Sequence, residues 1–174
     1  MKKWITSILI IILMFLLQTS VFRFFSFGGI VPNLLIMITC IYGFMRGEHD
    51  GLLTGFFCGL LMDIFYMDVL GFYALIYMYI GFLCGMSHKL FYKQDFKLPI
   101  IAIILGDLSY SFINFLFFYL LNGNFNVRFY ATSILLPELF YTLGVSIVFY
   151  PLLILLEFKF ITVPWKKREK DTQK

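Results

Sequence analysis

Six apolar runs separated by short polar turns occupy most of the chain, and no connection between them is long enough to form a soluble domain. Hydrophobic residues make up 61% of the 174 residues, and charged residues only 14%. Such a chain cannot hide its apolar side chains in one water-soluble core of normal proportions. The sequence therefore predicts an all-α, polytopic membrane protein with a single six-helix transmembrane domain over residues 1–174. The predicted spans are Trp4–Phe22, Ile30–Met45, Leu52–Tyr66, Leu70–Met86, Leu98–Leu121 and Thr132–Phe158.

The distribution of basic residues predicts the orientation. With the N-terminus in the cytoplasm, twelve of the 14 basic residues fall on the cytoplasmic side, and only Arg23 and Arg128 fall outside. This is the asymmetry that the positive-inside rule describes. An even number of spans places the C-terminus in the cytoplasm as well, as a short basic tail over about residues 159–174. We interpret the tail as a topology anchor that contacts anionic lipid, with docking onto a cytoskeletal filament as the alternative.

No residue pattern indicates catalysis. Cys40, Cys58 and Cys84 lie within predicted spans and lack the paired spacing of a zinc site. His49 and His88 lie in separate cytoplasmic turns, where solvated loop residues are expected. There is also no phosphate-binding glycine loop and no nucleophile beside a base. The sequence predicts a protein that is not an enzyme and that uses no metal, no cofactor and no nucleic acid.

Small residues recur on two neighbouring spans. On the third predicted span glycines follow one another every four residues and an aspartate continues the series, so these residues share one helical face. The next span repeats the spacing, and a further glycine lies in the turn between the spans. Such a face permits close packing within the bundle or docking of a partner helix, and the sequence leaves both open. The candidates are Gly51, Gly55, Gly59, Asp63, Gly71, Gly81 and Gly85.

Acidic residues occur inside the spans, whereas basic residues do not. An aspartate at the centre of a span costs about 2.5 to 3.5 kcal/mol, so each acid must face the interior of the bundle. The helical rise places Asp63, Asp107 and Glu138 between the midplane and the outer leaflet, near a helix break expected at Pro137. Two interpretations remain open. These acids and Asn114 line one polar pocket that opens outward, or each acid is satisfied separately.

Two segments resemble a known family. GFFCGLLMDIFYMDVLGFYAL, from Gly55 to Leu75, resembles the core signature of the MreD family of rod shape-determining proteins. VPNLLI, from Val31 to Ile36, resembles the proline-led second helix of that family, with Asn33 where an acidic residue is often seen. The resemblance implies a non-enzymatic scaffold in the bacterial cytoplasmic membrane that supports rod shape and lateral peptidoglycan synthesis. Its implied partners are MreC and, in the same complex, RodA, a class B penicillin-binding protein and MreB.

The resemblance also supplies an alternative function. The family is similar in fold to the substrate-binding S components of energy-coupling-factor vitamin transporters, so an S component is the second hypothesis. The short outer loops, with only Arg23 and Arg128 as bases, favour the scaffold. Within either hypothesis we expect Asp63 to be the most consequential polar residue, because a hydrogen bond there would fix the third helix at the end of its glycine face.

Overall fold

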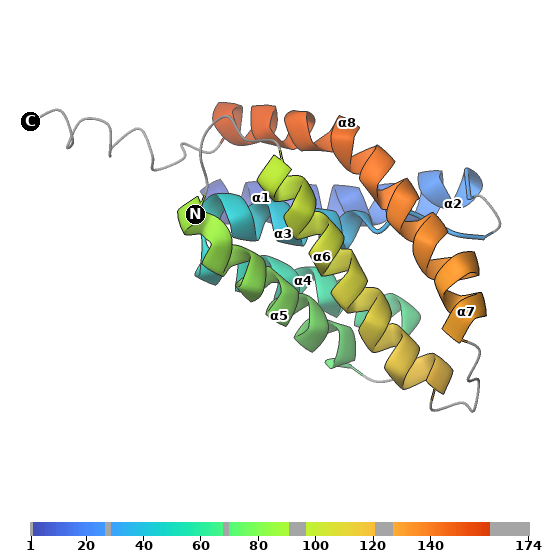
Figure 1. Cartoon of the computed structure of the whole chain (residues 1–174). Coiled ribbons are helices and arrows are strands. Elements are labelled where there is room, and N and C mark those ends of the chain that lie inside the picture. Colours follow the sequence, from blue (N-terminus) through green and yellow to red (C-terminus); the bar gives the residue numbers. More distant parts are fainter. Residues whose placement is uncertain (1, 27–28, 68–69, 91–96, 121–126, 161–174) are drawn as a thin grey trace, which may run out of the picture.

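The computed structural model describes residues 2–26, 29–67, 70–90, 97–120 and 127–160, which form an all-α structure with six helices (Figure 1). The six are α1 (Lys2–Leu16), α3 (Leu34–Arg46), α4 (Glu48–Tyr66), α5 (Phe72–Met86), α6 (Lys97–Asn114) and α8 (Leu136–Phe160). Shorter segments extend them: η1 (Leu17–Val21) and α2 (Phe22–Phe24) after α1, η2 (Ser87–Leu90) after α5, η3 (Phe115–Leu120) after α6, and α7 (Val127–Tyr130) with η4 (Ala131–Leu135) before α8. The predicted basic tail lies outside the described residues beyond Phe160.

Three helical stretches are long and apolar enough to cross a membrane: Trp4–Phe24, Leu98–Phe117 and Arg128–Leu156. Helices α3 and α5 are also apolar but shorter. These helices indicate a multi-pass membrane protein. Whether all six predicted spans cross the bilayer stays a prediction.

The outer surface of the bundle is apolar along whole helices. On α1 the exposed side chains include Leu9 and Leu13, and on α5 they include Leu75, Tyr79 and Leu83. Their spacing of four residues makes continuous stripes on the outside of each helix. Stripes of this size on a water-soluble monomer would be an aggregation hazard, whereas lipid chains cover them without cost.

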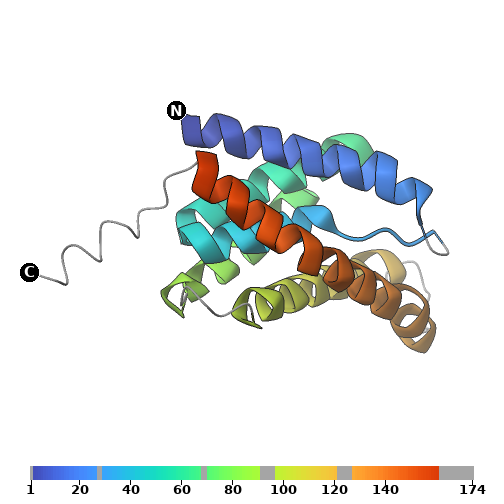
Figure 2. The ribbon, with the colours of Figure 1, turned by 90° about the horizontal axis from the view of Figure 1, so that it is seen from above.

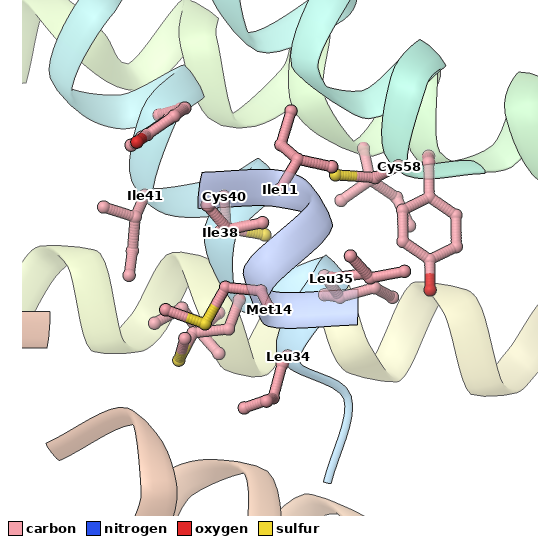
Figure 3. Close-up of a cluster of buried hydrophobic side chains, with 14 of the residues drawn as sticks. Ile11, Met14, Leu34, Leu35, Ile38, Cys40, Ile41 and Cys58 are labelled. Carbon is pink, nitrogen blue, oxygen red and sulfur yellow. The ribbon is translucent and has the colours of Figure 1, made fainter. Parts of the chain in front are cut away.

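Helix α3 lies at the centre of the bundle. Every residue from Leu34 to Met45 is buried, and α3 contacts α1, α4, α5, α6 and α8 (Figures 1 and 2). Figure 3 shows Ile11 and Met14 of α1 packed over this helix, with Cys58 of α4 on another side. Thirteen residues give only about 20 Å of helix, less than the hydrocarbon core of about 30 Å. Because neighbouring helices enclose α3, its length need not match the bilayer.

Two predicted boundaries near α3 were wrong. The second helix begins at Leu34 instead of Ile30, because Pro32 and Asn33 precede it and the Asn33 side chain caps its first turn. The third begins at Glu48 instead of Leu52, so the predicted turn from Arg46 to Gly51 shortens to Gly47, with φ of 103°. The acidic residues of that segment lie in the first turn of α4, where the helix dipole favours negative charge.

The predicted helix break at Pro137 was also wrong. The chain stays helical from Val127 to Phe160, and the last span therefore starts earlier than Thr132. The π-helical segment η4 ends immediately before Leu136. A π-helical turn changes the hydrogen-bond register, and this change coincides with a proline that offers no N–H. The helix thus accommodates Pro137 by local rewinding.

Candidate functional site

Three glycines of α4 lie directly against the backbone of α5. There is no space for a side chain at Gly51, Gly55 or Gly59, because a Cβ would overlap a carbonyl oxygen of α5 in each case. The carbonyl oxygens concerned belong, in order, to Gly81, Tyr77 and Tyr73. The α5 position falls by four residues each time the α4 position rises by four. The two helices therefore pack antiparallel with their backbones in contact along three successive turns.

A third helix joins this contact at its end. A Cβ on Gly43 of α3 would lie 2.6 Å from the Gly81 carbonyl oxygen and 3.1 Å from the Gly85 amide nitrogen. A Cβ on Gly85 would overlap the backbone of Glu48 at the start of α4. We call this contact of α3, α4 and α5 the glycine seam. The chain fills it with its own helices, so it leaves no room for a partner helix there.

Asp63 ends the glycine face and caps the next helix. Its carboxylate accepts hydrogen bonds from the backbone N–H groups of Gly71 (2.9 Å), Tyr73 (2.8 Å) and Ala74 (3.0 Å). The first N–H groups of a helix have no partner within the helix, and α5 begins at Phe72. Asp63 supplies these partners from the preceding helix while being fully buried. One side chain thus satisfies the start of α5 and ties it to the end of α4.

Gly71 has a different role from the other candidate glycines. It has φ of 107°, and nothing lies within 4 Å of the position where its Cβ would be. It occupies the N-cap position of α5, which in most helices carries the capping side chain. Because glycine has none, the distant Asp63 does the capping. The requirement at Gly71 is a left-handed backbone rather than close packing.

The other polar candidates do not all lie together. Asn114 accepts a hydrogen bond of 3.0 Å from the hydroxyl of Tyr73, whose own backbone N–H donates to Asp63. Asp107 of α6 is 1% exposed, and Glu138 of α8 lies close enough to interact with it electrostatically. The four candidates therefore form two groups. The first is Asp63 and Asn114, joined through Tyr73, and the second is Asp107 and Glu138.

A polar seam between α6 and α8 surrounds this second group, and its regular spacing was not used in the sequence prediction. On α8 the polar residues follow one another every four positions, at Glu138, Thr142 and Ser146. Glu138 and Thr142 face Asp107 and Ser111, which are also four residues apart on α6. Apart from the half-buried Glu138, all of these side chains are buried. Two i, i+4 series of polar residues in apolar helices are the signal that could have predicted the contact.

Asn33 connects this seam to the core and was also missed as a site residue. Its Oδ1 accepts hydrogen bonds from the Ile36 amide (3.2 Å) and the Tyr77 hydroxyl (3.0 Å). Its backbone N–H donates to Oγ1 of Thr142, at 3.1 Å. One buried residue therefore caps α3 and links it to α5 and α8. An asparagine just before an apolar run is a recognised start signal for a helix, which makes the capping part of this role predictable.

Polar contacts also close the opposite end of α3. A guanidinium nitrogen of Arg46 donates to the Ser7 hydroxyl of α1 at 2.7 Å, and the guanidinium lies 3.8 Å from the centre of the Tyr42 ring. Nδ1 of His88 lies 2.8 Å from the Phe44 carbonyl oxygen. The expectation that His88 is only a solvated loop residue was therefore wrong. It joins η2 to the end of α3.

An apolar groove of about 300 Å³ lies between α5 and α6. Small side chains on both helices leave it open, and serines provide its only hydroxyl groups. Its lining residues are Ile80, Leu83, Cys84, Ser87, Ala102, Leu105, Gly106 and Ser109. Neither the glycine seam nor the polar seam fills this groove.

Within the described part of the chain, no group of three or more His, Cys, Asp or Glu side chains could hold a metal ion. Cys40, Cys58 and Cys84 are buried free thiols. They pack as small apolar side chains, as free cysteines commonly do in cores.

Comparison with known proteins supplies the identification. No curated protein and no solved structure matches the chain, whereas the family model described as rod shape-determining protein MreD matches residues 1–160. That match covers the whole glycine seam, Asp63 and the polar seam. The chain belongs to the MreD family, whose members are non-enzymatic membrane proteins that act in rod shape determination.

Proposed function

We propose that this protein is a membrane scaffold of the bacterial cell-elongation complex, which supports lateral peptidoglycan synthesis by packing its helices against MreC and the cell-wall synthases. Family membership over residues 1–160 is the observation that carries this proposal. RodA, a class B penicillin-binding protein and MreB belong to the same proposed complex.

The distribution of close contacts supports a scaffold that is rigid inside and adhesive outside. The glycine seam joins three helices backbone to backbone, and Asp63 fixes the turn between two of them. A scaffold needs such a fixed frame because its partners bind surfaces of constant shape. The outward-facing stripes of apolar side chains leave α1, α5, α6 and α8 in contact with lipid or with other membrane helices.

The groove between α5 and α6 is the surface that we assign to the transmembrane helix of MreC. Ala102 and Ser109 of α6, with Cys84 of α5 and Ser87 of η2, are small enough to let another helix approach closely. MreC has one transmembrane helix, and a single helix fits a linear groove between two others. The sequence also allowed a partner helix to dock on the glycine face, but helices of this chain already fill the glycine seam.

The placement of the helix ends supports the proposed topology. The start of α1 and the end of α8 lie at one end of the bundle, and α2 and α7 lie at the other (Figures 1 and 2). Arg23 belongs to α2 and Arg128 to α7, so the two bases assigned to the outside share an end. We propose that both termini are cytoplasmic, because this places the other basic residues inside.

A vitamin-binding S component is the competing function, and the polar seam is the feature that favours it. A bound vitamin would need polar groups around a cavity, whereas the lining of the α5–α6 groove is mainly apolar. Calorimetric titration of the purified protein with a vitamin panel separates the two functions. A tight small-molecule complex would favour the S component.

The direct test of the scaffold is genetic and biochemical. The gene for this protein is expressed in a rod-shaped bacterium that lacks its own MreD, and cell width and MreC recovery are measured in the same strain. We expect rod shape to return and MreC to purify with the protein. Stable expression in the membrane with round cells and no MreC recovery would contradict the proposal.

A further inference from the structure

Two aspartates are buried to the same extent in the helices but have opposite surroundings. Asp63 is 0% exposed and Asp107 is 1% exposed. Asp63 accepts three backbone N–H groups. Neither carboxylate oxygen of Asp107 has a hydrogen bond of ordinary geometry, although the Thr142 hydroxyl lies beside the group. The chain therefore contains its own comparison between a buried carboxyl group with hydrogen-bond donors and one without them.

The difference in donors determines the charge that each site can hold. A carboxylate in an apolar interior is stable only when N–H or O–H donors, or a positive charge, replace the water it has lost. Three backbone N–H groups meet this need at Asp63. Asp107 lacks such donors, so its neutral, protonated form is the one that its surroundings accept.

The titratable groups around Asp107 strengthen this argument. They come from every packed element nearby: Cys40 of α3, Tyr77 of α5, Tyr130 of α7 and Glu138 of α8. Each of these groups is neutral or becomes negative on losing a proton. No base acts on Asp107 from the described residues. A negative charge at this position would be both unsolvated and next to Glu138.

We propose that Asp107 is a proton-binding site: its carboxyl group carries a proton at neutral pH, and the polar seam between α6 and α8 is built around this neutral form. The Thr142 hydroxyl, which already accepts the Asn33 N–H, offers Asp107 at most one donor, against the three N–H groups around Asp63. Loss of the proton places a charge between α6 and α8 beside Glu138 and weakens the contact of the two helices.

Infrared spectroscopy tests the proposal without requiring a reagent to reach the buried site. The C=O stretch of a protonated carboxyl group is separate from the bands of a carboxylate. The full chain is reconstituted in lipid, and difference spectra are recorded at pH 7 between the wild type and the variants Asp107→Asn and Asp63→Asn. We expect the first variant to lose a protonated-acid band and the second to lose carboxylate bands. Loss of carboxylate bands in Asp107→Asn would overturn the proposal.

Stability measurements give a second readout if one variant yields weak spectra. The amide of Asp107→Asn imitates the neutral acid but needs no proton uptake on folding, so at pH 7 this variant should unfold at a higher denaturant concentration than the wild type. Because the folded wild type holds a proton that the unfolded chain has already released above about pH 4, its stability should fall as pH rises from about 4 until Asp107 ionises in the folded state. Asp107→Asn should lose most of that dependence. The role of Glu138 is tested with Glu138→Gln, which removes a like charge and should move the loss of the Asp107 acid band to lower pH. An unchanged pH profile in Asp107→Asn would contradict the proton site.

Discussion

Adding one methyl group at Gly55 should destabilise the bundle, although alanine is a better helix former than glycine. A Cβ at this position would overlap the carbonyl oxygen of Tyr77, and it would lie 2.6 Å from the carbonyl carbon of that residue and 3.0 Å from Cα of Met78. All three atoms belong to the backbone of α5, so no side chain can rotate away. The substitution Gly55→Ala must therefore push the two helices apart.

The expected magnitude follows from two opposing effects. Overpacking a filled contact costs about 1 to 3 kcal/mol, and the upper part of this range applies because backbone meets backbone over three turns. Replacing glycine by alanine inside a helix returns up to about 1 kcal/mol. Gly55→Ala should thus lower the free energy of unfolding by about 2 kcal/mol.

Gly144 provides a matched control in the same chain. It lies inside α8, and nothing is within 4 Å of the position where its Cβ would be. Gly144→Ala should be neutral or stabilising by up to about 1 kcal/mol. Unfolding of both variants in mixed micelles, titrated with sodium dodecyl sulfate and followed by circular dichroism, measures the difference. If Gly55→Ala is at least as stable as Gly144→Ala, the helices are not in the contact described.

Three further predictions concern the cap, the core and the topology. Asp63→Leu should leave three N–H groups at the start of α5 without an acceptor and cost about 3 to 6 kcal/mol. Asp63→Asn keeps one acceptor oxygen and should be milder. Wild-type stability of Asp63→Leu would show that the cap does not hold the turn, and equal losses in both variants would show that the negative charge itself is needed. Asn33→Ala should cost about 2 to 4 kcal/mol, because the Ile36 amide and the Tyr77 hydroxyl both lose their acceptor in a buried site. If this variant unfolds at the same denaturant concentration as the wild type, the capping role is contradicted. Reporter fusions at residue 174 and in the segment from Arg46 to Asp50 should indicate the cytoplasm, and a fusion near Asn124 should indicate the outside. A cytoplasmic signal near Asn124 would contradict the six-span topology.

The helix content was predictable because hydropathy and glycine spacing depend on local sequence. The spacing of Gly51, Gly55 and Gly59 indicates a shared face in any helix, and the structure places these residues on one contact. What the spacing leaves open is the identity of the neighbour. A GxxxG-type face can meet its own chain or a partner equally well, because both provide a helix backbone.

The boundaries and polar contacts were less predictable because they depend on residues distant in the sequence. Pro137 was expected to break a helix, but a π-helical turn accommodates it. Asp63 caps a helix that starts nine residues later, a distance that no local capping pattern contains. The grouping of Asp107 with Glu138 depends on how α6 and α8 pack, and hydropathy treats both residues only as unfavourable.

The central claim, a scaffold that receives a partner helix between α5 and α6, is tested most directly by photo-cross-linking in living cells. A benzophenone amino acid is placed at Leu105, which lines the groove, and at Phe140 of α8 as a control that is 72% exposed. Both positions face outward, so a difference between them reports the partner and not general exposure. The scaffold account predicts a cross-link to MreC from Leu105 and a much weaker one from Phe140. Equal cross-linking from both positions, or cross-linking from Phe140 alone, would contradict it.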